Sequence, residues 1–250
     1  MRRLAFGLLL LSLHVGLLHA VRAADDDPAA IIDKAVKAHF PKGVDKTHLA
    51  TRSKSKGTLH LMGMDLDYNQ EVAVQLPNKL KETMDLEVMG KKINVVSVYN
   101  GKEAWIKSGD NNVPVNDEIL AEFKEATYSI GLLQGMFLKD KDLALSLVGE
   151  SKVKDKPTIA VKISRKGKKD ITLYFDKETG LIAKVEMRKR DFQSGQEVNE
   201  ERIITEYQEV SGRKIAKKIE VLRDGKPFLE GEVTSVEVLE KLDDNEFAKP

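Results

Sequence analysis

From Leu59 to Leu239 the sequence reads as a succession of strands in which apolar and polar residues alternate, separated by short turn sequences. Between Met64 and Leu76, every second residue is apolar except Gln70, and most of the intervening residues are Asp, Asn, Glu or Gln. This period of two is typical of antiparallel strands that bury one face. About a dozen strand candidates follow at hairpin-like spacing, which predicts one sheet that curls or partly closes.

The alternation is interrupted once, between Asn116 and Leu138. Asn116 or Asp117 can cap a helix there, and apolar residues then recur at helical spacing. The end of the segment, from Ile130 to Leu138, is apolar on most sides and so must be covered on most sides. We expect the concave face of the curved sheet to cover it.

A helix is also predicted before the sheet, because Asp27 can cap it and Pro28 suits its first position. Its apolar stripe consists of Ile31, Ile32, Ala35, Val36 and His39, and we expect this stripe to pack on the back of the sheet. Two local features are predicted within the sheet. Asn100-Gly101 favours a two-residue hairpin turn, and the changed parity of apolar residues near Gly231 indicates a bulge.

Residues 1–23 have the layout of a signal peptide: a basic start, an apolar stretch from Leu4 to Leu18, and a small-residue site at Val21-Arg22-Ala23. The apolar stretch is short for a membrane span, and an uncleaved anchor is the alternative reading. We therefore expect a protein of the periplasm or a secreted protein, with no membrane span after cleavage. No linker-like segment divides residues 24–250, which predicts a single domain.

The composition and the motifs exclude several kinds of functional site. The chain has no cysteine, which excludes disulfides, a thiol nucleophile, thiolate metal ligands and a lipid-modified N-terminal cysteine. Its 41 basic and 40 acidic side chains are balanced, whereas a nucleic-acid-binding protein would show a basic excess. His39, His48 and His60 are not spaced as metal ligands. No nucleophile elbow, phosphate loop or dinucleotide motif is present, so we predict neither an enzyme nor a cofactor.

Two basic clusters stand out, at residues 165–169 and 188–190. The predicted hairpins bring them to the same end of the sheet, where Lys166, Lys168, Arg188 and Arg190 are candidates for docking an acidic protein partner or anionic lipid head groups. The alternative is solubilising charge at strand ends, because lysine commonly protects exposed β edges.

Several motifs, in this order, resemble one family over essentially the whole chain after the leader. They are Leu76-Pro77-Asn78-Lys79-Leu80, the stretch from Tyr99 to Trp105, the hairpin from Leu173 to Leu181, the stretch from Tyr207 to Arg213, and the closing residues from Asp243 to Pro250. Together they resemble the periplasmic lipoprotein-carrier (LolA-like) superfamily of outer-membrane lipoprotein-sorting proteins.

The resemblance implies an unclosed β-barrel, or half-barrel, whose concave apolar face is plugged by short helices and binds acyl chains of a lipid or lipoprotein. By position, residues 116–138 would form the lid. Carriers that deliver lipoproteins place an arginine immediately before the proline, where it fastens the lid. This chain has Leu76 at that position, so the resemblance does not imply that an arginine fastens the lid here.

The combined hypothesis is an exported, monomeric, non-catalytic binder or carrier of a lipid or lipoprotein. One alternative is an envelope sensor or protein-interaction domain built on the same fold. Another is that the apolar residues of the insert complete a core and leave no cavity. The residues expected to line the apolar cavity and its lid are Leu59, Leu61, Leu66, Leu86, Trp105, Phe123, Leu133, Met136, Phe137 and Phe175.

Overall fold

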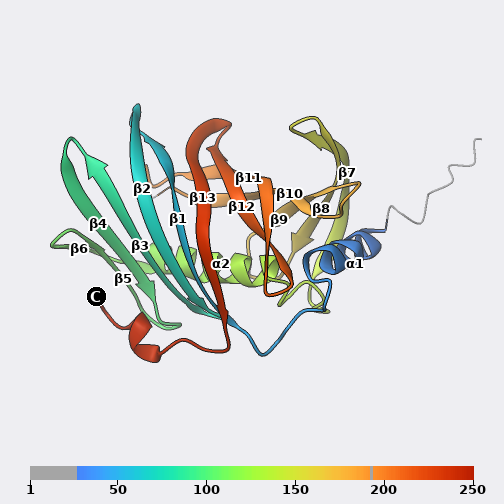
Figure 1. Cartoon of the computed structure of the whole chain (residues 1–250), viewed down its shortest axis with the longest axis horizontal. Helices are drawn as coiled ribbons and strands as arrows, with labels where there is room; N and C mark the ends of the chain where they lie inside the picture. The colour runs from blue at the N-terminus through green and yellow to red at the C-terminus, as the bar shows by residue number, and fades with distance from the viewer. Residues whose placement is uncertain (1–26, 192–193) are drawn as a thin grey trace, which may run out of the picture.

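The computed structural model describes residues 27–191 and 194–250, so the expected signal peptide lies outside the described residues. Thirteen antiparallel strands form one sheet in the order β6-β5-β4-β3-β2-β1-β13-β12-β11-β10-β9-β8-β7. The sheet curls around a long helix without closing on itself (Figure 1). The predicted fold, an unclosed antiparallel half-barrel with an N-terminal helix and a helical insert, is confirmed.

The chain runs through two sets of strands with one long helix between them. The first half comprises α1 (Pro28–His39), β1 (Ala50–Leu61), β2 (Met64–Gln75), β3 (Lys79–Val88), β4 (Lys91–Tyr99), β5 (Ala104–Ser108), β6 (Asn111–Val113) and α2 (Asp117–Leu133). The second comprises β7 (Ala144–Val153), β8 (Lys156–Ser164), β9 (Ile171–Asp176), β10 (Ile182–Arg190), β11 (Glu197–Val210), β12 (Arg213–Arg223), β13 (Lys226–Leu239) and the 3₁₀ helix η2 (Asp244–Phe247).

The two halves join where β1 pairs with β13, and the sheet is tightly coiled there. Gly57 lies opposite Gly231, and a Cβ atom on Gly57 would stand 1.9 Å from the carbonyl oxygen of Glu230. No side chain fits in that space. Beyond it, the register slips at Thr234, which confirms the predicted bulge. A bulge increases local twist, so both features help curl the sheet.

Helix α1 begins as predicted, because the Asp27 side chain accepts a hydrogen bond from the backbone N–H of Ala29 at 3.1 Å. All five residues of its predicted stripe are buried. The stripe packs with Val161 and Leu173, which point to the inner face of the sheet. The expectation that α1 covers the back was wrong, because the outward residues of these strands, such as Lys162, are polar.

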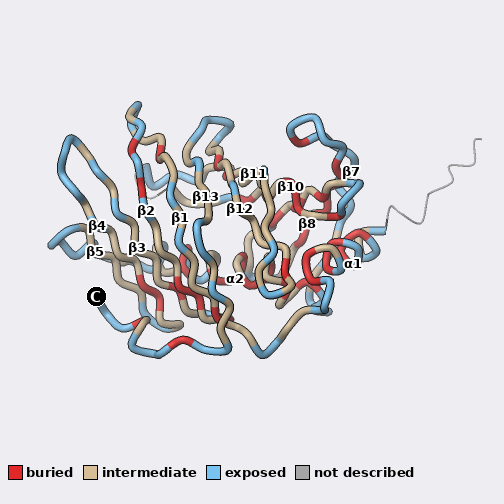
Figure 2. The backbone as a smooth tube through the Cα atoms, viewed as in Figure 1, coloured by how far each residue is buried: buried red, intermediate tan, exposed pale blue. Residues whose placement is uncertain are grey.

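Helix α2 crosses the concave face as a single helix, and the Asn116 side chain caps it by accepting from the N–H of Ile119 at 2.9 Å. Most buried residues lie around this helix, a smaller buried cluster lies nearer the hairpin tips, and the tips themselves are exposed (Figure 2). Leu132 is fully buried in the cluster that contains α1 and the inner residues of β8 to β10. The core therefore occupies one end of the half-barrel.

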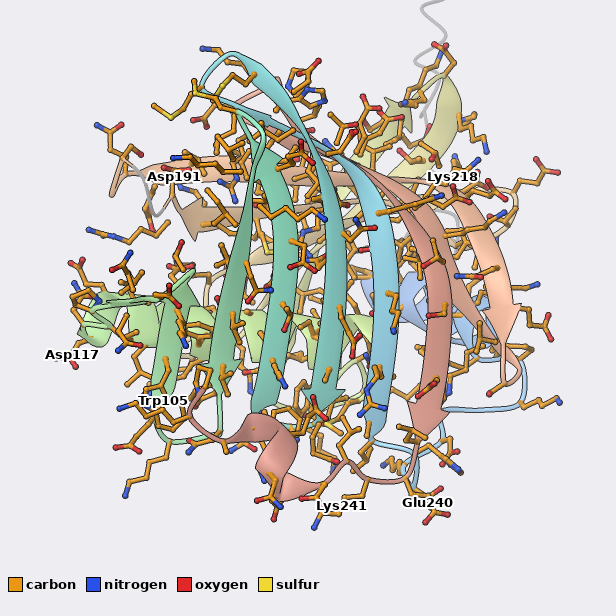
Figure 3. All side chains as sticks on the ribbon, turned by 60° about the vertical axis from the view of Figure 1, so that its left-hand side comes forward. Trp105, Asp117, Asp191, Lys218, Glu240 and Lys241 are labelled. Atoms are coloured by element: carbon orange, nitrogen blue, oxygen red, sulfur yellow. The ribbon has the colours of Figure 1, made fainter. Side chains whose placement is uncertain are left out.

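The segment after β13 covers part of the outer face. Leu242 and Phe247 form an apolar cluster there with Ala73 and Val98, and Trp105 packs against it (Figure 3). The prediction that Trp105 lines the concave cavity was wrong. Trp105 pairs with Val98 across β4 and β5, and neighbours paired in this way share a face, here the outer one.

The turn between β4 and β5 also differs from the prediction. Tyr99 pairs with Ala104, so the loop has four residues rather than two. The Asn100 side chain accepts hydrogen bonds from the N–H groups of Lys102 at 2.9 Å and Glu103 at 2.8 Å. Asn favours turns of this kind because its side chain can replace a backbone acceptor, and here it stabilises the longer loop.

The sheet has two free edges of different character. Edge strand β6 has only 3 residues. Edge strand β7 is longer, but its register slips at Val148, because Leu147 pairs with Val161 while Gly149 pairs with Ala160. Neither edge is a long, regular strand.

Candidate functional site: a cavity beneath helix α2

A cavity of about 270 Å³ lies between the C-terminal half of α2, the end of α1 and the concave face of the sheet. Its wall is mostly aliphatic and comes from segments far apart in the chain. The lining residues are His39, Phe40, Thr51, Ser53, Ile130, Leu133, Gln134, Ile182, Val185, Ile204, Tyr207, Arg213, Lys214, Ile215, Ala216, Val233 and Val236. The insert therefore covers a hollow rather than filling the whole concave face.

Most polar groups in the cavity wall already have partners. His39 accepts from the N–H of Ile182 through Nε2 at 3.0 Å, and its Nδ1 lies 3.3 Å from the carbonyl oxygen of Lys214. Burial lowers the pKa of His39 and outweighs the opposing hydrogen bond to Lys214, which favours the neutral ring. Tyr207 donates to the carbonyl oxygen of Ile182 at 2.7 Å, and burial raises its pKa. His39 and Tyr207 thus present neutral groups to a ligand. The charged residues of the wall are Lys214, which pairs with Glu209 at 3.1 Å, and Arg213.

Arg213 is the exception in this wall. It is 9% exposed, and its one ion pair among the described residues joins Nη2 to Asp45 Oδ2 at 3.6 Å. That separation is too long for a hydrogen bond, and the side chain makes no hydrogen bond with any other described residue. A charged group with five donors therefore has no hydrogen-bond acceptor among the described residues at the edge of an apolar cavity, and its nitrogens are not fully enclosed.

Leu133 is the only predicted site residue in the cavity wall. Leu59, Leu61, Leu66 and Leu86 share the concave face but form a separate apolar cluster with Tyr68, toward the hairpin tips. The structure thus separates these leucines from the cavity that they were expected to line.

The remaining predicted apolar residues hold α2 in place. Phe123 stacks on Tyr99 with ring centroids 6.1 Å apart, and Phe137 stacks on Tyr128 at 5.7 Å. Phe175 is buried in the core beneath α1. The last predicted residue, Met136, lies at the contact between α2 and the sheet, where it packs against the cluster that contains Phe123.

The cavity residues that the sequence analysis missed come mainly from β11, β12 and β13. Val236 was not selected because it lies beyond the register slip at Thr234 in β13, where simple alternation no longer assigns faces correctly. Val233 precedes that slip and Ile204 precedes the slip beside Glu206 in β11, so alternation itself would have placed both on the inner face. The parity change near Gly231 was the available signal, and applying it to each following residue would have placed Val236 on the inner face.

The two basic clusters pair with acidic residues on one side of α2. Three ion pairs, which we call the lid clamp, join Arg190 to Glu118 at 2.7 Å, Lys169 to Glu122 at 2.6 Å and Lys168 to Glu125 at 3.1 Å. The acidic residues have the spacing of one helix face. The sequence thus contained a matching signal in the spacing of these three glutamates.

The lid clamp corrects the expected docking surface. Lys168 and Arg190 bind this chain's own helix, and Arg188 lies 3.5 Å from Glu197. Among the described residues, Lys166 alone of the four candidates has no ion pair. At the position where carriers have the lid arginine, Leu76 is 4% exposed and packs with Phe123. Here α2 is held by apolar contact on one side and by ion pairs on the other.

Neutralising two pairs of the clamp should loosen α2. We expect the double variant Lys168→Gln/Arg190→Gln to lower hydrogen-exchange protection of α2 amides about 3- to 30-fold, because partly exposed ion pairs contribute roughly 0.3 to 1 kcal/mol each. Native-state hydrogen exchange measures this directly. Arg188→Gln is the matched control, since its partner Glu197 lies outside α2. Equal protection in all three proteins would contradict the clamp.

Within residues 27–191 and 194–250, no group of three or more His, Cys, Asp or Glu side chains is arranged to hold a metal ion. Within the same ranges, no helix has both the length and the apolar character needed to cross a bilayer.

Sequence comparison identifies no relative, because no family model matches the chain. No curated protein matches it either. Comparison with solved structures does identify similar proteins. A DUF1329 family protein from Desulfovibrio piger aligns with 14% identity and a TM-score of 0.51, over 89% of this chain and 98% of that protein. A LolA superfamily protein from Nitrosomonas europaea aligns with 10% identity and a TM-score of 0.51, over 89% and 97%. In fold, the chain is therefore similar to DUF1329 and LolA superfamily structures across most of its length.

Proposed function

We propose that the protein is an exported, non-catalytic binder of one acyl chain or a similarly slender apolar ligand, which it holds in the cavity beneath α2. The observation that carries the proposal is the cavity itself: an aliphatic hollow of about 270 Å³ under a helix, with most of its polar groups already paired. The fold shared with a LolA superfamily structure supports it, and so does the leader-like N-terminus.

The size of the cavity limits the ligand. Pockets for drug-sized molecules span about 300 to 1,000 Å³, and the observed 270 Å³ falls just below that range. With α2 in place, one chain fits and a lipid with several chains does not. Each buried methylene contributes roughly 0.8 kcal/mol, so a chain of ten carbons has enough apolar surface for specific binding. A lipoprotein would require α2 to move.

The alternative function, a sensor or interaction domain that uses the basic clusters, has less support. Its motivation was a free basic surface, and three of its four proposed contact residues are paired within the chain. The alternative of a filled core is not supported either, because a cavity lies beneath the insert.

Filling the cavity provides the test. Ala216 lines it, so Ala216→Phe should reduce the affinity for a neutral ligand such as dodecan-1-ol at least tenfold, whereas the melting temperature should stay equal or rise because a void is filled. Displacement of a neutral fluorescent naphthylamine measures the affinity. The matched control is Ala121→Phe on the exposed side of α2. Unchanged binding in Ala216→Phe, or no binding by the wild-type protein, would overturn the proposal.

A further inference from the structure

Arg213 has a position that the binding of a plain hydrocarbon does not explain. It is about nine-tenths buried, and among the described residues its guanidinium has only the 3.6 Å contact with Asp45. Buried charged groups are normally hydrogen-bonded. The Arg213 nitrogens are not fully enclosed, so they are open to an acceptor that a ligand supplies.

Arg213 also stands between two hollows. On one side is the apolar cavity under α2. On the other is a more polar surface hollow, lined by Lys42, Gly43, Val44, Asp45, His48, Ser211, Gly212 and Val238 as well as Arg213. Of the described residues, Arg213 alone lines both. A molecule with an apolar end inside the cavity would therefore have its other end at this guanidinium.

The acidic neighbour of Arg213 is already occupied by other donors. Asp45 accepts from the N–H and the hydroxyl of Thr47 at 2.8 and 2.7 Å, and its Oδ2 lies 2.5 Å from His48 Nδ1. The Thr47 hydrogen bonds hold the pKa of Asp45 well below its usual value. Asp45 is the only carboxylate among the lining residues of the surface hollow, whereas Lys42 and Arg213 are both cationic. The hollow thus has a positive excess that favours a second anion.

We propose that Arg213 binds the anionic head of a single-chain amphiphile whose hydrocarbon tail occupies the cavity beneath α2. A fatty acid carboxylate or an alkyl phosphate has this chemistry. Guanidinium binds either anion through paired N–H donors, and the tail gains from burial against aliphatic residues such as Ile204 and Val233. The inference rests on the proposed function, because it needs the same cavity to hold the tail.

The test compares ligands that share a tail and differ in the head: dodecanoate, dodecyl phosphate and dodecan-1-ol, each displacing the neutral naphthylamine from the whole protein. We expect the wild-type protein to bind at least one of the anions about tenfold or more tightly than the alcohol, since a hydrogen bond to a charged group contributes about 1.5 to 3 kcal/mol. The anion that gains more distinguishes carboxylate from phosphate. Acetate and inorganic phosphate, which have no tail, should displace nothing.

Arg213→Met should remove the preference for the anions over dodecan-1-ol, while Arg213→Lys should keep part of the preference. Lys218→Met is the matched control, because it removes one positive charge from a side chain on the outside of the sheet (Figure 3). Binding of the alcohol also verifies that each variant is folded. Equal affinities for all three ligands in the wild type, or an unchanged preference in Arg213→Met, would overturn the head-group site alone. Failure of every ligand to bind would overturn the proposed function, and this inference with it.

Discussion

Replacing Gly57 with alanine is expected to lower the free energy of unfolding by more than about 3 kcal/mol. The new Cβ atom would lie 1.9 Å from the carbonyl oxygen of Glu230 and 2.8 Å from the Cα atom of Gly231. Both are backbone atoms, so relief requires β1 and β13 to separate where the halves of the sheet join. Thermal unfolding should show a melting temperature about 6 to 12 °C lower, at 2 to 4 °C per kcal/mol for a protein of this size.

The opposite glycine provides a matched comparison. A Cβ atom on Gly231 would lie 2.3 Å from the hydroxyl oxygen of Tyr68, with its next contact 3.4 Å away. Gly231→Ala should therefore destabilise the protein, and adding Tyr68→Phe should recover most of that loss because the clashing atom is gone. The same tyrosine change should not rescue Gly57→Ala. Two results would contradict the close backbone approach of β1 and β13 at Gly57. One is a wild-type melting temperature for Gly57→Ala, and the other is equal rescue of both glycine variants by Tyr68→Phe.

The second large effect concerns Glu200, which is 1% exposed on the concave face. Its carboxylate lies 2.8 Å from Arg202 Nε, 3.2 Å from Arg223 Nε and 3.6 Å from Lys189 Nζ. Removing the charge from a buried, paired carboxylate leaves the cations without a counter-charge. We expect Glu200→Gln to lower the free energy of unfolding by about 3 kcal/mol at pH 7, measured by urea denaturation.

The pH dependence of the free energy of unfolding follows from the same contacts of Glu200. Burial alone would raise the pKa of Glu200, but the attraction of Arg202 and Lys189 outweighs it and lowers the pKa from 4.5 to about 2. Because the pKa is lower in the folded state, the ionised form stabilises the protein above pH 4.5, and this contribution is lost as the pH falls toward 2. The shift corresponds to about 3 kcal/mol. Wild-type and Glu200→Gln stabilities should therefore differ most at neutral pH and converge near pH 2.

An exposed carboxylate serves as the control for this experiment. Glu209 pairs with Lys214 at 3.1 Å, but its side chain is 57% exposed. Glu209→Gln should change the free energy of unfolding by less than about 1 kcal/mol at any pH, because exposed pairs contribute little. If the difference in the free energy of unfolding between the wild type and Glu200→Gln stayed constant from pH 7 to pH 2, the effect could not be assigned to the Glu200 charge.

Local sequence signals were sufficient to predict the elements of this fold. The caps Asp27 and Asn116 mark where the two helices begin, and alternation assigns the inner face of β2 correctly because its register is unbroken. The failures involve residues whose role depends on distant segments. Trp105 looked like an inner residue until the covering segment around Phe247 was known.

The cavity could be expected in general but not residue by residue. Leu133 was predicted because it belongs to the apolar insert, whereas Val236 lies beyond a register slip that alternation cannot follow. The basic clusters were noticed for their charge, and only the folded arrangement shows that Glu118, Glu122 and Glu125 meet them. Arg213 gave no signal, since its significance comes from lying between two hollows.

The two free edges of the open sheet affect how the protein behaves at high concentration. An unclosed sheet exposes unpaired backbone groups at both margins, and another chain could add to them strand by strand. The 3 residues of β6 offer too short a template for this, and the irregularity at Val148 interrupts the template along β7. A half-barrel that leaves room for a guest molecule is thereby protected from growing into a fibre.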